Sequence, residues 1–240
     1  MRPWDYVDSE EVPDDDGTIY LMSRGSQYAI HVNGQELMDN RMHGSEDAHA
    51  DLACESLADL ENAKILVGGL GMGFTLAAAL RQIGAGGQVT VAELIPAVVR
   101  WNREYVGRAA GHPLRDERVN VYVGDVGDLV EVPPTLWSAI LLDVDNGPKS
   151  LTRPTNSWLY SHRGLRAAHD ALIPGGVLGI WSAATDDALT ERLLDTGFDV
   201  DELMYSEAGR PTHPDFDFHV LWTARKRPSV APPSVAPQCP

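Results

Sequence analysis

Three glycines at alternate positions, Gly69, Gly71 and Gly73, follow the apolar run 65–67 and precede the helix-forming residues 75–80. An apolar run that enters a glycine-rich turn and leaves it as a helix is typical of a buried parallel strand and its crossover. Glycine lets the backbone turn sharply and lets a ligand lie against the main chain, and the N–H groups of the helix start face that ligand. These glycines are therefore candidate cofactor-binding residues.

Glu93 ends a second strand-like run, about 20 residues after the glycines, where an acidic residue accepts hydrogen bonds from ribose hydroxyls. The glycine spacing is G-x-G-x-G, unlike the G-x-G-x-x-G of dinucleotide sites, and the phosphate-loop motif G-x-x-x-x-G-K-S/T is missing. A nucleoside without a pyrophosphate fits this spacing best, and S-adenosylmethionine (SAM) is the commonest such cofactor. NAD binding and a purely structural turn are the alternatives.

Acidic residues also end the next two strand-like runs, Asp125 the third and Asp143, with Asp145, the fourth. The ligand of an open α/β sheet lies at the carboxyl ends of its strands, so these carboxylates are expected to converge with Glu93. Asp125 would contact the adenine amino group, and Asp143 would lie where the donor sulfonium and the acceptor meet. An amine acceptor with a pKa near that of lysine, about 10.4, needs a base, and Asp143 is the candidate. A loop cap would explain one such residue, but three at successive strand ends favour a site.

The elements that position these residues alternate between strand-like and helix-like runs from Lys64 onward, which predicts a mostly parallel sheet with right-handed crossovers. The predicted strands are 65–67, 88–92, 119–123, 138–142 and 177–181, with an antiparallel closing pair near 199–206 and 217–225. The predicted helices include 46–60, 98–105, 158–172, closed by Pro174-Gly175-Gly176, and 186–196. We therefore predict an α/β fold with a mostly parallel seven-stranded sheet.

The region before the glycine turn reads as a separate, β-rich unit. Residues 18–39 form β-rich runs separated by glycine turns, and Asn33-Gly34 is the strongest hairpin signal in the chain. Residues 1–17 are acidic and are predicted to be irregular. We predict three parts: an N-terminal meander with its lead-in helix at 1–62, a SAM-binding domain at 63–226, and a Pro- and Ser-rich, disordered tail at 227–240.

Composition narrows the class of partner. The 240 residues carry a formal charge of −16, which argues against nucleic acid, because a phosphate-binding face needs clustered Lys and Arg. An acidic surface suits a cationic small-molecule substrate, and solubility explains it as well. No apolar run approaches a membrane span, and no secretory leader is apparent. With two cysteines, the sequence predicts a cytoplasmic protein without disulfides, and it leaves a homodimer open.

The motifs together resemble the spermidine synthase family, within the class I SAM-dependent transferases. The resemblance covers residues 18–226. Gly68-Gly69-Leu70-Gly71-Met72-Gly73 looks like the family's nucleoside loop, and Gly124-Asp125 matches its adenine motif. Asp143-Val144-Asp145-Asn146-Gly147-Pro148 resembles its D-x-x-D-P-x-G-P loop with one residue missing. The resemblance implies a Rossmann-like class I methyltransferase fold behind a small β-rich domain, and a first loop Asp, here Asp143, that deprotonates an attacking amine.

The chain departs from the family where the amine substrate is expected to bind. The family's glycine loop carries an Asp that holds the aminopropyl amine, and Met72 occupies that position. The family's Tyr-His-Glu motif has no match in register, although His43, Glu46 and His49 could substitute for it. Asp145 and Tyr160 are further candidates for substrate binding. The spacing of His43, Glu46 and His49 suits a solvated helix start better than a metal site, so no metal is expected.

Three readings stay open. The first is a SAM-dependent methyltransferase acting on a small molecule, which the loss of the amine-binding Asp favours. The second is an aminopropyltransferase, similar to polyamine synthases, that uses decarboxylated SAM. The third is a non-catalytic nucleoside-binding protein, against which the presence of Asp143 argues.

Overall fold

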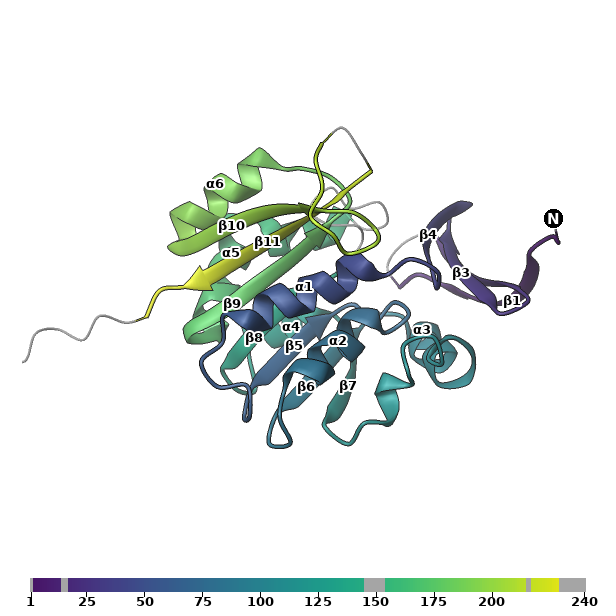
Figure 1. Ribbon diagram of the computed structural model, residues 1–240, viewed down its shortest axis with the longest axis horizontal. Helices are drawn as coiled ribbons and strands as arrows, with labels where there is room; N and C mark the ends of the chain where they lie inside the picture. Colours follow the sequence, from purple (N-terminus) through teal and green to yellow (C-terminus); the bar gives the residue numbers. More distant parts are fainter. Residues whose placement is uncertain (1, 14–16, 145–153, 215–216, 229–240) are drawn as a thin grey trace, which may run out of the picture.

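The computed structural model describes residues 2–13, 17–144, 154–214 and 217–228. In this part of the chain two sheets lie side by side, one of four strands near the N-terminus and one of seven strands (Figure 1). Asp145 lies outside the described residues, and so do residues 229–240, on which the prediction of a disordered tail rests. None of the helices in the described ranges is long and apolar enough to span a membrane.

The small sheet is an antiparallel meander of β1 (Asp5–Glu11), β2 (Thr18–Arg24), β3 (Gln27–Val32) and β4 (Gln35–Asp39). The hairpin predicted at Asn33-Gly34 is confirmed: both residues have positive φ and join β3 to β4. The prediction that 1–17 is irregular was wrong, because β1 pairs with β2. The carboxylate of Asp8 in β1 accepts hydrogen bonds from Arg100 Nη2 and Trp101 Nε1, each at 2.7 Å. This tertiary contact outweighs the low strand propensity of acidic residues.

The large sheet has the strand order β10-β11-β9-β8-β5-β6-β7, and its strands run in one direction except β11, which is antiparallel to both of its neighbours. The predicted seven-stranded α/β fold is therefore confirmed. Its strands are β5 (Lys64–Gly68), β6 (Gln88–Glu93), β7 (Val119–Val123), β8 (Trp137–Leu142), β9 (Leu172–Ser182), β10 (Phe198–Tyr205) and β11 (His219–Lys226).

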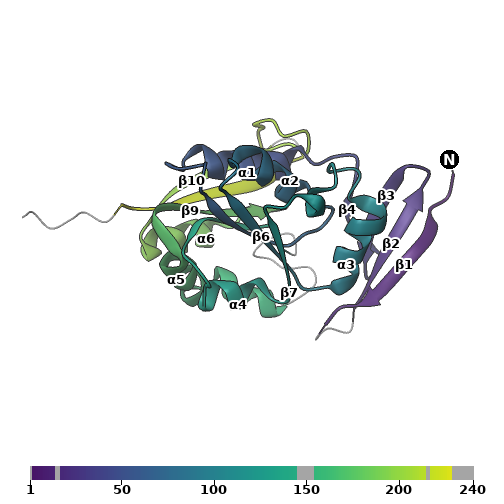
Figure 2. The ribbon, with the colours of Figure 1, turned by 90° about the horizontal axis from the view of Figure 1, so that it is seen from below.

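Helices cover both faces of the large sheet (Figure 2). One core lies between the sheet and α1 (Gly44–Glu55), α2 (Phe74–Gln82) and α3 (Pro96–Trp101), and it continues into the N-terminal sheet. The other core lies under α4 (Val126–Glu131), α5 (His162–Ala171) and α6 (Asp187–Thr196). Ile65 and Val67 belong to the first core and Leu66 to the second, as the two-residue period of a strand requires. The domain boundary predicted after residue 62 falls in the connection between α1 and β5.

Two local features differ from the sequence-based expectation. Pro174-Gly175-Gly176, predicted to close a helix, lies inside β9, because that strand starts directly after α5. The pairing of β8 with β9 shifts register there, and an irregular stretch of ladder tolerates a proline, which donates no hydrogen bond. In addition, α3 continues as a π-helix, η1 (Asn102–Val106). Short 3-10 helices occur at η2 (Pro113–Arg115) and η3 (Pro154–Tyr160).

Candidate active site

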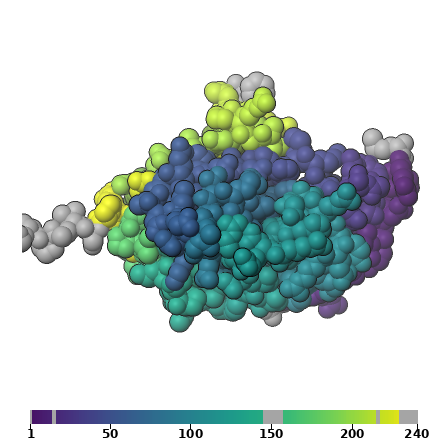
Figure 3. All heavy atoms as spheres, turned by 60° about the horizontal axis from the view of Figure 1, so that its bottom comes forward, coloured from purple at the N-terminus to yellow at the C-terminus, as the bar shows by residue number. Residues whose placement is uncertain are grey.

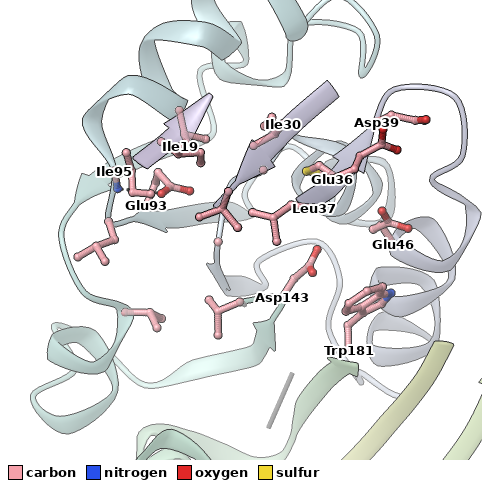
Figure 4. Close-up of a pocket in the computed structure, with 18 of the residues that line it drawn as sticks. Ile19, Ile30, Glu36, Leu37, Asp39, Glu46, Glu93, Ile95, Asp143 and Trp181 are labelled. Atoms are coloured by element: carbon pink, nitrogen blue, oxygen red, sulfur yellow. Dashed lines mark hydrogen bonds between the residues drawn. The ribbon is translucent and has the colours of Figure 1, made fainter. Parts of the chain in front are cut away.

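A cavity of about 410 Å³ opens at the carboxyl ends of β5, β6 and β8. This is a usual size for a small-molecule site. The opposite wall comes from β2, β3 and β4 of the small sheet and from the start of α1, and Trp181 of β9 and His219 of β11 also line the cavity. Figure 4 shows Asp143 between Glu93 at one end and Glu46 with Trp181 at the other. The connection between β10 and β11 stands out from the surface beside α1 (Figure 3), and the Glu207 carbonyl there accepts a hydrogen bond from Gly44 N at 2.9 Å.

Gly69 fixes the turn to its neighbouring strands. Its N–H donates to the Ala92 carbonyl at the end of β6, and Asp143 N donates to the Gly68 carbonyl, both at 2.9 Å. Gly69 has φ +89°, and a Cβ at this position would overlap the Asp143 carbonyl oxygen. Glycine is therefore required here for the close approach of the two strand ends.

The other two glycines of the motif separate in space. Gly71 lines the cavity, and a Cβ there would come within 2.9 Å of Met38 Sδ, which lies on the opposite wall. Gly73 caps α2 instead, and a Cβ there would meet Pro113 and Asn102. The structure thus places Gly69 and Gly71 at the cavity and Gly73 at the helix start behind it.

Glu93 is buried at the end of β6 and joins the glycine turn to the chain beyond the strand. Its Oε2 accepts a hydrogen bond from Leu70 N and its Oε1 accepts one from Ile95 N, both at 2.9 Å. Glu93 also lines the cavity, as its predicted role requires.

Asp125 lines the cavity at the end of β7 and caps α4, because its Oδ1 accepts from Gly127 N at 2.8 Å. Leu94, Ile95 and Val126 lie on the same part of the wall. A planar base would find apolar contacts there, next to a carboxylate that can accept a hydrogen bond from an amino group.

Asp143 and Glu46 form the acidic centre of the cavity. Thr75 Oγ1 donates to Asp143 Oδ2 at 2.7 Å, and burial by the surrounding protein raises the pKa of Asp143 to about 6. Burial, and after it the nearby charge of Asp143, raises the pKa of Glu46 to about 7. The two carboxylates come from β8 and α1, 97 positions apart in the printed sequence.

Hydrogen bonds extend from Glu46 to the last strand. Ser45 Oγ donates to Glu46 Oε2 at 2.6 Å, and His219 Nδ1 lies 2.8 Å from Ser45 Oγ. The Trp181 ring is tilted against the His219 ring with their centroids 4.5 Å apart. Both His219 and Trp181 line the cavity.

Two of the predicted substrate-binding residues lie away from the cavity lining. His43 stacks on Phe74 with ring centroids 4.1 Å apart, and its Nδ1 lies 2.8 Å from Asp47 Oδ2. Tyr160 is 2% exposed and belongs to the core under α5 and α6. The aromatic and imidazole rings predicted here are thus used for packing, whereas Glu46 does reach the cavity.

Sequence reasoning missed His219, Ser45 and Thr75. His219 lies in a strand whose polar residues were interpreted as an exposed alternating face. The register of β11 between β10 and β9 places this residue beside Trp181, and no spacing in the sequence signals a contact with α1. Thr75 had a weak signal only, since it is a hydroxyl in the first turn of the helix that follows the glycines.

The lining is strongly acidic. Among the described residues that line the cavity, one carries a guanidinium and seven carry carboxylates, namely Glu36, Asp39, Glu46, Glu93, Asp125, Asp143 and Glu207. The guanidinium, on Arg41, is paired with the Asp39 carboxylate. Within the described ranges, no group of three or more His, Cys, Asp or Glu side chains could hold a metal ion.

Comparison with known proteins shows which solved structures share this fold. No protein-family model and no curated protein matches the sequence. Among solved structures, spermidine synthase from Thermotoga maritima has a TM-score of 0.72 at 16% identity, over 92% of this chain and 72% of that chain. A spermidine synthase in complex with the transition-state analogue AdoDATO has a TM-score of 0.71 at 15% identity, over the same shares. The chain therefore has the Rossmann-like fold of spermidine synthases.

Proposed function

We propose that this chain is a transferase that uses a SAM-type sulfonium donor and an amine acceptor, and that the donor is decarboxylated SAM. The observation that carries the proposal is the charge of the cavity: the described part of its lining holds seven carboxylates and one guanidinium, and that guanidinium is paired with one of the seven, Asp39. SAM itself brings a carboxylate, which this lining would repel. Decarboxylated SAM brings a sulfonium and an ammonium, which it would attract.

The residues present fit a nucleoside of this kind. Gly69 and Gly71 allow close approach to the backbone, Glu93 lines the cavity at the end of β6, and Asp125 lies beside an apolar wall for the base. When bound, the donor supplies a carbon already activated for displacement by its positive sulfur. The protein then has to orient the acceptor and remove its proton.

Asp143 is the group we assign to proton removal. An alkylammonium has a pKa of about 10.4, so a base with a raised pKa accepts its proton more readily than an ordinary carboxylate does. Burial raises the pKa of Asp143 to about 6, which moves it in that direction. The Thr75 hydroxyl holds the other side of the carboxylate in place. Glu46, the second carboxylate at this end, would bind the cationic acceptor.

The structural neighbours support the aminopropyl form of the reaction more than methyl transfer, because both are spermidine synthases. Methyl transfer remains the second candidate on one observation. Met72 stands where the family carries the Asp that holds the aminopropyl amine, and its side chain is fully buried in the core.

Calorimetry with SAM, decarboxylated SAM and S-adenosylhomocysteine tests the proposal directly. We expect decarboxylated SAM to bind at least about tenfold more tightly than SAM, equal to about 1.4 kcal/mol. A screen of primary amines with both donors, followed by mass spectrometry, then identifies the group transferred. Tighter binding of SAM with methylated products would establish the second candidate. Nucleoside binding without any product would favour a non-catalytic role.

A further inference from the structure

A hydrogen-bonded chain connects the last strand of the sheet to the acidic end of the cavity. His219, the first residue of β11, lies 2.8 Å from Ser45 Oγ, and Ser45 donates to Glu46 Oε2 at 2.6 Å. Ser45 is fully buried and Glu46 is 9% exposed. Two segments separated by 174 residues therefore meet at one carboxylate.

The donor and the acceptor in each of these two hydrogen bonds follow from the number of protons available. A serine hydroxyl has a single proton, and Ser45 gives it to Glu46. The Ser45 oxygen must then accept from His219, so His219 carries its proton on Nδ1. Burial lowers the pKa of His219, which favours this neutral form. The contact with the Trp181 ring holds the imidazole plane.

The surroundings of Glu46 otherwise oppose its ionisation. Asp143 faces it from β8, and Asp47 follows it on α1, although His43 and Arg81 engage that carboxylate. The other charged groups of the described lining near this end are Glu36 on β4, the Asp39–Arg41 pair, and Glu207 in the connection beside α1. Desolvation and like charge raise the pKa of Glu46, and the hydrogen bond from Ser45 lowers it.

We propose that His219 and Ser45 are positioning residues that orient the Glu46 carboxylate toward Asp143 and favour its anionic form, so that the two carboxylates bind one alkylammonium group. This inference rests on the proposed function, because it assigns the acceptor end of that same cavity. It adds a role for β11, which among the described residues contributes His219 to the lining, next to Trp181 of β9.

The first test examines the hydrogen bonds from His219 through Ser45 to Glu46 in the ligand-free protein. In ¹⁵N NMR, His219 should be neutral with its proton on Nδ1. In ¹³C NMR, the Glu46 carboxyl, assigned with Glu46→Gln, should titrate in Ser45→Ala about one pH unit higher than in wild type, since one charged hydrogen bond is lost. His219→Phe keeps a ring against Trp181 but removes the donor, and it should shift the titration in the same direction. An Nε2–H tautomer, or equal titration midpoints in wild type and both variants, would overturn the proposal.

The second test measures ammonium binding with n-butylamine as probe and n-butanol as the neutral control. At pH 7, Ser45→Ala should bind n-butylamine about fivefold more weakly than wild type, because less of Glu46 is ionised. At pH 9 the two proteins should bind it alike, since Glu46 is ionised in both. A structural defect would weaken binding equally at both pH values, and that result would contradict the proposal. Weak n-butanol binding should not change with the variant.

The outcomes separate the two proposals. If nucleosides bind and amines react, but Ser45→Ala behaves as wild type, the positioning role fails and the proposed function stands. If the titration and the pH-dependent amine binding appear as expected, but no nucleoside binds, the positioning role stands and the proposed function fails.

Discussion

Replacing the Glu46 carboxyl by an amide should stabilise the ligand-free protein at alkaline pH and change little in acid. Burial raises the pKa of Glu46 from its ordinary value of 4.5 to about 7 in the folded chain. At pH values between about 4.5 and about 7, the folded state therefore keeps the Glu46 proton, whereas the unfolded state has released it. Stability falls wherever the folded state binds more protons, so wild type loses stability as the pH rises from about 4.5 to about 7. Glu46→Gln has no such proton.

The magnitude follows from the same two values. Each pH unit between them corresponds to about 1.4 kcal/mol, which gives about 3 kcal/mol over the full window. Between pH 5 and pH 8, about 2.5 kcal/mol of this difference should appear. The residue is 9% exposed, so solvent screening removes little of it.

Urea denaturation of wild type and Glu46→Gln at pH 5 and pH 8 provides the measurement. The free energy of unfolding of the variant, relative to wild type, should rise by about 2.5 kcal/mol from the lower to the higher pH. Glu55→Gln removes an exposed carboxylate from the end of the same helix and controls for the loss of one negative charge. A difference between wild type and Glu46→Gln that is the same at both pH values would refute a buried, proton-holding Glu46.

Three further substitutions test the rest of the site. Gly71→Val places a branched side chain at φ +49° against Met38, so nucleoside binding should fall below detection in calorimetry; unchanged affinity in a folded variant would sink the nucleoside assignment. Glu93→Ala removes two hydrogen bonds to backbone N–H groups, each worth about 1.5–3 kcal/mol, so thermal unfolding should show a loss of at least about 3 kcal/mol together with weaker nucleoside binding. A normal melting temperature would contradict this. Asp143→Asn should lower turnover on an amine by about 10²–10⁴, while donor affinity stays within a few-fold of wild type. Turnover should partly recover at high pH, where more of the amine is neutral. Loss of donor affinity together with turnover would instead show that Asp143 holds the donor.

The sheet and the position of its carboxyl edge could be predicted from the sequence because both depend on local signals. Buried parallel strands are continuous apolar runs, and their ends must lie along one edge, so Glu93, Asp125 and Asp143 were expected at one ligand. The structure places all three on the lining of the same cavity. β1 was not predictable in the same way, because its acidic residues are stabilised by Arg100 and Trp101, far along the chain.

The opposite wall of the cavity depends on contacts between distant segments, and single-sequence patterns carry little of that information. His43 and Tyr160 have the right chemistry for a substrate pocket, yet one stacks on Phe74 and the other completes an apolar core. His219 looked like an exposed strand residue, yet β11 inserts between β10 and β9 and carries it to Ser45. Packing decides which of these polar side chains faces the cavity. A ring that is buried in a core stabilises the fold more than a ring that stays in water, because its apolar surface is removed from water.

Met72 stands where the resemblance to the spermidine synthase family leads one to expect an acidic residue, but other carboxylates supply negative charge to the cavity. Met72 is buried in the core, whereas α1 and β4 bring Glu46 and Asp39 to the cavity from segments that precede the sheet. Arg41, the guanidinium of the described lining, is paired with Asp39, which balances its positive charge. A donor that carries a carboxylate therefore meets more repulsion here than one that has lost it. The comparison of SAM with decarboxylated SAM measures this difference directly, because the two donors differ only in that group.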